Sequence, residues 1–268
     1  MPTVQEIVDV LFAWAPAALA WEKDNVGILT GDAGAECTGI LVSLDVTREV
    51  IAEAVSRGAN VVVAHHPVIY RPLSSIRDDA EQGRLIGDIL RNHLTVVAMH
   101  TNADAAATGV NTCLAETLGL RDTEPLGAAQ PGAAAGEGLG TLGLLPQPML
   151  IRDFVAHVKR TLGCTAVRAS RHDADATIHR VAVCGGAGGS LLETAARRGA
   201  QAFVTADLNY HAFLDYGRRL LVLDAGHYET EFPFINRCVE VLRAGLFDKM
   251  EKSRIFPALT MTNGMCTV

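Results

Sequence analysis

Two adjacent histidines, His65 and His66, stand directly after an apolar run of valine and alanine, and Pro67 follows them. A short β-branched run that ends at a proline is typical of a buried strand in a parallel sheet. In open α/β sheets, ligands bind beyond the carboxyl ends of the strands. We therefore expect both imidazoles at an edge where metal binding or proton transfer takes place. A pair of ordinary loop histidines is the alternative.

Residues of the same types follow other apolar runs. His100 stands four residues before Asp104, and His227 stands four residues before Glu231. The polar residues that end predicted strands are His65, His66, His100, Asp104, Asp207, His227 and Glu231. Imidazole and carboxylate without thiolate suit zinc, iron, manganese, cobalt or nickel, and so large a set can hold two divalent ions that share an oxygen ligand.

The spacing of His227 and Glu231 would place both on one face of a helix. Pro233 is comfortable only in the first turn of a helix, so we expect that helix to begin no earlier than about Thr230. His227 would then lie in a loop and Glu231 near a helix N-terminus. The alternative is that Glu231 merely caps the helix.

A strand, helix and strand pattern occurs twice, in residues 40–67 and again in residues 180–211. Both helices end in Arg-Gly-Ala, and superposing those tripeptides places His66 opposite Asp207. We infer two related α/β halves, residues 1–125 with His65, His66 and Asp104, and residues 126–268 with His227 and Glu231. Their strand ends are expected to meet in a common cleft.

Composition narrows the class of protein. The 268 residues are 49% hydrophobic with a net charge of −7, which suits one large or two ordinary α/β domains. Without a basic stripe we expect no nucleic-acid or anionic-membrane surface. The N-terminus reads as an amphipathic helix that stops near Pro16, with neither a secretory signal nor a membrane span. Six scattered cysteines indicate a reducing compartment, and we expect a cytoplasmic protein.

Several segments yield no clear chemistry. Residues 67–79 could form a lid over the cleft or an ordinary surface loop. Residues 127–140 are rich in glycine and alanine and suggest a flexible connector. The run CGGAGGSLLE fails the GxGxxG pattern, so we expect a tight turn there and no dinucleotide cofactor. Ser43 and Thr205 lie near strand ends without an evident base and are read as ordinary polar residues.

A series of motifs is spread in order along nearly the whole chain. The motifs are WEKDNVGILTGD, LVSLDVT, AHHP, HTNAD followed by GVN, VAVCGGAGGSLL, TADLNYH and GHYETE. This ordered set resembles the NIF-three-like family, often described as GTP cyclohydrolase 1 type 2 homologues. The resemblance implies a two-lobed α/β subunit in a toroidal homohexamer, with a dinuclear metal centre between the lobes. The implied ligands are His65, His66, Asp104, His227 and Glu231, with Glu231 as the bridge.

The same resemblance places His100 and His211 near the site, as proton-handling candidates. The chain matches the compact form of the family, which has no inserted middle domain, and it has Thr-Ala-Asp at 205–207 where Thr-Gly-Asp is more usual. We predict a mixed or parallel α/β fold and a metal-dependent hydrolase for a nucleotide-like or pterin-like small molecule. The alternatives are a non-catalytic metal-binding or metal-trafficking hexamer and an interaction protein with a vestigial metal site.

Overall fold

The computed structural model describes residues 1–127 and 134–265, which form two compact units. The first unit comprises Met1–Ala103 and Ile235–Thr262, and the second comprises Asp104–Phe234 and the residues from Asn263. This division differs from a single boundary after residue 125, because residues 104–125 belong to the second unit and a late strand joins the first. Part of the predicted connector, residues 128–133, lies outside the described residues.

The first unit is built on a five-stranded sheet in the order β1-β4-β3-β2-β11. The strands are β1 (Gly27–Thr30), β2 (Ile40–Ser43), β3 (Val61–Ala64), β4 (Thr95–Ala98) and β11 (Ile255–Pro257). β11, β2, β3 and β4 run parallel, and β1 pairs antiparallel with β4 at one edge. Every residue of β2, β3 and β4 is buried, as the continuous apolar runs predict for a parallel sheet with helices on both faces.

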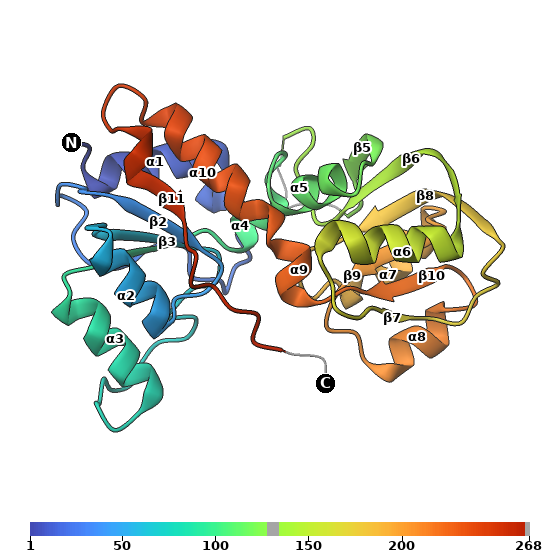
Figure 1. The fold of residues 1–268 in the computed structure, drawn as a ribbon, viewed down its shortest axis with the longest axis horizontal. Helices are drawn as coiled ribbons and strands as arrows, with labels where there is room; N and C mark the ends of the chain where they lie inside the picture. Colours follow the sequence, from blue (N-terminus) through green and yellow to red (C-terminus); the bar gives the residue numbers. More distant parts are fainter. Residues whose placement is uncertain (128–133, 266–268) are drawn as a thin grey trace. The chain divides into compact units, whose positions relative to one another are not determined.

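The helices of the first unit lie on both faces of this sheet (Figure 1). They are α1 (Val4–Trp14), η1 (Ala17–Leu19), α2 (Arg48–Ser56), α3 (Glu81–Arg91) and η3 (Lys252–Arg254), together with parts of α4 (Thr101–Ala105) and α10 (Pro233–Gly245). α1 begins at a capping box formed by Thr3 and Glu6. It ends before Pro16, where the predicted amphipathic helix was expected to stop. α2 and α3 pack against alternate strand residues through a core that includes Val50, Ile86 and Ile89.

Strand register in the first unit aligns the carboxyl ends of three neighbouring strands. Ala64 at the end of β3 pairs with Ser43 of β2 and with Ala98 of β4. The residues that follow these three strands therefore emerge at one edge of the sheet.

The second unit contains a six-stranded sheet in the order β5-β6-β8-β9-β10-β7. The strands are β5 (Arg121–Pro125), β6 (Thr141–Leu150), β7 (Arg168–Ala169), β8 (Thr177–Val183), β9 (Ala202–Thr205) and β10 (Leu221–Asp224). β8, β9 and β10 are parallel, and the remaining pairs are antiparallel. Thr205 at the end of β9 pairs with Asp224 at the end of β10, so the loops after these strands also start level with each other.

Two helical layers enclose the second sheet. The helices are α5 (Val110–Thr117), α6 (Ile151–Leu162), η2 (Gly189–Leu191), α7 (Leu192–Arg197), α8 (Tyr210–Tyr216) and α9 (His227–Glu231). α5 and α6 pack on the side of Val181 and Val183, whereas α7 and α8 pack on the side of Ala182. Successive side chains of β8 therefore pack into two separate hydrophobic cores, because side chains alternate between the two faces of a strand.

The predicted mixed α/β architecture, with two sheets flanked by helices, is confirmed. Both predicted strand, helix and strand units are present, as β2, α2 and β3 in the first unit and as β8, α7 and β9 in the second. Within the described residues, no helix combines the length and the apolar character needed to cross a membrane.

Glu53 on α2 holds the segment that follows β11. Its carboxylate accepts hydrogen bonds from the backbone N–H groups of Leu259 and Thr260 and from Thr260 Oγ1, at 2.8 to 3.0 Å. Burial by itself would raise the pKa of Glu53, but these hydrogen bonds outweigh it, and the pKa lies below its ordinary value of 4.5. The ionised form is therefore favoured in the folded protein.

We expect Glu53→Gln to lower the free energy of unfolding by about 2 kcal/mol at pH 7, because charge-assisted hydrogen bonds are lost. The pKa of Glu53 is lower in the folded protein than in the unfolded chain. The stabilisation by the ionised carboxylate is therefore complete at pH values above 4.5, and it is lost as the pH falls through the folded-state pKa. The difference between the wild type and the variant should accordingly shrink below a pH of about 4.5 in urea unfolding curves. Glu22→Gln, at an exposed position, is the control. An equal difference at all pH values would contradict the assignment.

Candidate metal centre

Three histidines of the first unit form a cluster beyond the carboxyl ends of β3 and β4. One ring nitrogen of each of His65, His66 and His100 lies within 4.8 Å of the others. Their ring centroids are 4.9 to 5.7 Å apart. His65 is fully buried, and the other two are partly exposed. We name these three residues the histidine cluster.

Each ring of the histidine cluster is oriented in the same manner. The Nδ1 atom of His65 donates to the backbone oxygen of Met99 at 2.7 Å, that of His66 to Asp45 at 3.0 Å, and that of His100 to Asp24 at 2.9 Å. An oxygen acceptor on Nδ1 requires the proton on that atom, which leaves the Nε2 lone pair for a metal ion. Histidine ligands of metal sites have this arrangement, in which the second ring nitrogen is held by a carboxylate or carbonyl.

Asp24 anchors His100 from the loop before β1. Its carboxylate also accepts hydrogen bonds from the backbone N–H and the hydroxyl of Thr101. Burial acts to raise the pKa of Asp24, but the hydrogen bonds from His100 and Thr101 prevail and hold the pKa well below its usual range. On another side of His100 stands the half-exposed ring of Tyr70, perpendicular to the imidazole at 6.2 Å between centroids.

The second unit contains a pair formed by His227 and Glu231 on α9. His227 Nε2 lies 3.0 Å from Glu231 Oε1, and His227 Nδ1 donates to Asp207 at 2.6 Å. Both members of the pair lie on one helical turn, so the expected helix start near Thr230 is wrong. α9 is a separate short helix, and Pro233 opens the next helix, α10, where its missing N–H costs nothing. We name this pair with Asp207 the His227 triad.

The glycine run after β8 packs directly against the His227 triad. The N–H of Gly186 donates to Thr230 Oγ1, and that of Gly185 donates to Asn111 Oδ1, whose amide in turn donates to the backbone oxygen of Asp104. A Cβ atom on Gly186 would lie 2.3 Å from Glu231 Oε1. The predicted tight turn is therefore present, and its lack of side chains lets the backbone approach the carboxylate.

Charge in the second unit favours nitrogen and oxygen ligands. The hydrogen bond with Glu231 raises the pKa of His227 to about 9 despite partial burial, with Asp207 adding to the effect. Burial, with the charges of Asp104 and Glu231, raises the pKa of the nearby Cys184 thiol. A thiol of raised pKa stays protonated at neutral pH and is a poor ligand. The available donors fit zinc, iron, manganese, cobalt or nickel.

The structure brings together some of the predicted site residues. His65, His66 and His100 form one cluster, and His227 and Glu231 form the other pair. Asp104 belongs to the second unit, on α4, close enough to Cys184 for its charge to act on the thiol. His211 is exposed on α8, where its ring contacts Tyr210, and it joins no group of three potential ligands among residues 1–127 and 134–265.

Three residues that contact the histidine cluster were not among the predicted site residues, namely Asp24, Asp45 and Tyr70. Asp45 follows β2 by two residues, as His66 follows β3, so the parallel register supplied a usable signal for the contact between them. Asp24 lies 76 positions before His100, and its loop has no pattern that links the two residues.

The fold and these residues define a mixed α/β protein with imidazole and carboxylate groups gathered beyond strand ends. The chain belongs to the Duf34/NIF3 (NGG1p interacting factor 3) family, whose model matches residues 2–260. It is 33% identical over 233 residues to a "GTP cyclohydrolase 1 type 2 homolog" of Clostridium acetobutylicum, covering 87% of this chain and 86% of that protein. It is 34% identical over 251 residues to the homolog of Lactococcus lactis, covering 91% and 94%.

Solved structures agree with this membership. A Bacillus cereus "protein related to NIF3" superposes with a TM-score of 0.92 and 26% identity, covering 100% of this chain and 99% of that one. Staphylococcus aureus protein SA1388 superposes with a TM-score of 0.91 and 25% identity, covering 100% and 99%. The resemblance that the motifs indicated is thereby confirmed.

We expect Gly186→Ala to weaken metal binding by about tenfold or more, because the added Cβ would collide with Glu231 and because φ of +60° is unfavourable for alanine. Gly189→Ala is the matched control, since its Cβ would make an ordinary contact with Leu208. Metal content after dialysis against buffered Zn²⁺ is the measurement, with thermal unfolding to check the fold. Equal metal retention by both variants would contradict the close packing against Glu231.

We expect Zn²⁺ binding at pH 7 to displace about one proton from His227, because the raised pKa leaves this imidazole protonated in the metal-free protein. Because the protonated form dominates below a pH of about 9, apparent affinity should increase from pH 6 to pH 9. Calorimetric titration in two buffers of different ionisation enthalpy counts the protons. His227→Ala should release about one proton fewer. Equal proton release by the wild type and the variant would exclude this exchange.

Proposed function

We propose that this chain is a hydrolase with a dinuclear metal centre, to which the histidine cluster and the His227 triad both contribute ligands. In this proposal His65, His66, Asp104, His227 and Glu231 would hold two divalent ions, and the Glu231 carboxylate would serve both. The observation that supports the proposal most strongly is the common orientation of four imidazoles. Each of His65, His66, His100 and His227 donates its Nδ1 proton to an oxygen, so Nε2 is the ring atom that would bind a metal ion, in His227 after the proton shared with Glu231 is released.

A pair of divalent ions, when bound, activates water near neutral pH and stabilises negative charge on the reacting oxygens. The protein's own residues provide the rest. Asp45 and Asp207 fix the rings of His66 and His227, and Asp24 fixes the ring of His100. An imidazole held in this manner can accept a proton at Nε2 from the attacking water and pass it to the leaving group. We assign this role to His100 ahead of His211, because His100 belongs to the histidine cluster and His211 does not.

The proposed substrate is a nucleotide-like or pterin-like small molecule. The names of the relatives support this class, and the half-exposed Tyr70 beside His100 offers a flat apolar surface on which a heterocycle can stack. Tyr70 stands near the start of the exposed segment 67–79, whose predicted role as a lid stays a prediction. We also propose that the protein forms a homohexamer and that it is located in the cytoplasm.

We expect two divalent ions per chain in the purified protein and turnover of a substrate in a screen of purine nucleotides, pterins and phosphoesters. His65→Ala and His227→Ala should each bind metal more weakly, contain less metal after purification, and lower kcat/KM by about a hundredfold or more. His179→Ala is the control, because His179 lies on β8 and belongs neither to the histidine cluster nor to the His227 triad. Elemental analysis and the activity screen are the measurements.

The outcome separates the proposal from its main alternative. His100→Ala should retain both metals but lower kcat, because the proton-transfer group is removed while the proposed ligands remain. A fully metal-loaded protein without turnover in this screen would contradict the hydrolase and favour a metal-binding or metal-trafficking hexamer. A protein that binds no metal would contradict both.

A further inference from the structure

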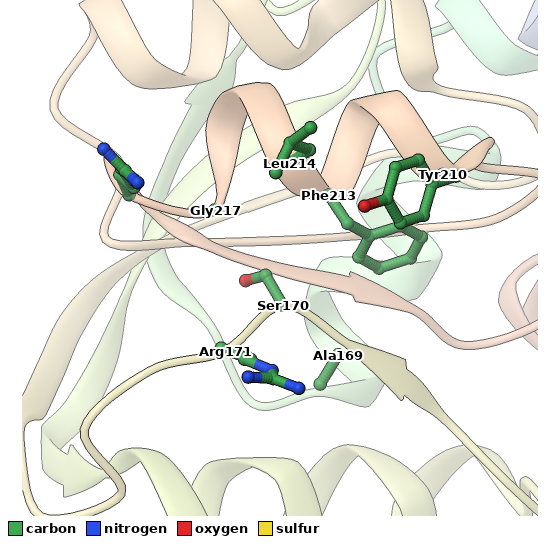
Figure 2. A pocket seen from close by; sticks show the side chains of 8 residues that line it. Ala169, Ser170, Arg171, Tyr210, Phe213, Leu214 and Gly217 are labelled. Atoms are coloured by element: carbon green, nitrogen blue, oxygen red, sulfur yellow. The ribbon is translucent and has the colours of Figure 1, made fainter.

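A cavity of about 570 Å³ lies in the second unit between α8 and the loop that follows β7. Figure 2 shows the side chains around it, with Tyr210 and Phe213 on the helix and Ser170 and Arg171 on the loop. Ala169, Leu214, Gly217 and Arg218 also line it. The volume is typical of pockets that bind small molecules. We name it the Ser170 cavity.

The Ser170 cavity is separate from the proposed metal centre. None of the predicted metal ligands lines it. The antiparallel pairing of β7 with β10 places Ala169 beside Leu223, and Ser170 bonds to Val222, five positions before His227. The cavity therefore lies along the side of the strand whose carboxyl end leads to the His227 triad.

Two positive charges border the Ser170 cavity without compensation. Within residues 1–127 and 134–265, neither Arg171 nor Arg218 forms an ion pair or a hydrogen bond through its guanidinium group, and none of the eight lining residues is acidic. The neighbouring Arg168, in contrast, is paired with Asp224. Two unpaired guanidinium groups at one cavity, in a chain of net charge −7, favour an anionic occupant.

Apolar side chains form another wall of the cavity. Tyr210 is 72% exposed and Leu214 is 55% exposed, and Phe213 lies beside them on the same helix. Large apolar surfaces left open beside a cavity are characteristic of ligand sites. The two aromatic rings provide flat surfaces against which a planar group can stack.

A buried hydroxyl group stands at the base of the cavity. Ser170 is 8% exposed, and its Oγ accepts a hydrogen bond from the backbone N–H of Val222 and pairs with His172 Nδ1 at 3.1 Å. Gly217 permits this placement, because a Cβ there would lie 2.8 Å from Ser170 Cβ. The position of the hydroxyl is thus determined by the backbone of β10.

We propose that the Ser170 cavity binds a small organic anion with a planar aromatic body. The anionic group lies toward Arg171 and Arg218, and the ring packs against Tyr210 and Phe213. This binding site is additional to the proposed hydrolase site and does not depend on it. The chemistry accommodates an aryl phosphate or an aryl carboxylate, and the first is the probe for the test.

Phenyl phosphate, titrated into the full-length protein by isothermal calorimetry, should show saturable binding. Inorganic phosphate has the anionic group without the aromatic ring, and benzyl alcohol has the ring without the anionic group. Each should bind about tenfold more weakly than phenyl phosphate or not at all. Arg171→Gln and Arg218→Gln should each weaken phenyl phosphate by about fivefold or more, and Tyr210→Ala should weaken it while Tyr210→Phe does not. Circular dichroism confirms that each variant is folded.

Two controls make the result specific. Arg160→Gln removes an exposed guanidinium from α6, outside the cavity, and should leave the affinity unchanged. His227→Ala should also leave it unchanged, which separates this site from the proposed metal centre. Three outcomes would overturn the proposal: no saturable binding, equal affinity in both arginine variants and the wild type, or loss of binding in His227→Ala. Loss confined to the variants of the Ser170 cavity would support it.

Discussion

The parallel register of neighbouring strands is the constraint on which the candidate site depends. In the first unit, Ser43, Ala64 and Ala98 pair with one another across three strands, so the chain leaves the sheet at one level after each of them. In the second unit, Thr205 and Asp224 are paired in the same way. Because β2, β3 and β4 are buried on both faces, a shift by one residue would move every side chain to the opposite face of the sheet and disrupt the packing there, so the register is strongly determined.

In each unit, hydrogen bonds then orient the imidazoles that lie beyond these strand ends. Oxygen acceptors from four different segments, namely Asp24, Asp45, Asp207 and the backbone of Met99, fix the imidazoles of the two clusters. Asp207 achieves this with a left-handed φ of 56°, a conformation that aspartate tolerates better than most residues. The neighbouring Ala206 does not have a positive φ and carries no such strain.

The sequence predicted the fold where the signal was local. Valine-rich runs identified β3 and β4, apolar residues at helical spacing identified α1, and the polar residues after strands identified His65, His66 and His100 as neighbours. Long-range pairing escaped this reasoning, since nothing near Ile255 indicates that β11 joins the first sheet beside β2. The start of α9 was missed because a helix break at Phe232 lets Pro233 begin a new helix. The role of Asp24 depends on tertiary contact alone.

In the proposed metal centre, the histidine cluster and the His227 triad hold one pair of metal ions. The decisive experiment is anomalous diffraction from crystals of the metal-loaded protein, collected at the absorption edges of zinc, iron, manganese, cobalt and nickel. We expect two anomalous peaks about 3.5 to 4 Å apart, ligated by residues of both units, with Glu231 between them. Peaks confined to one unit, or no peak at either cluster, would contradict it.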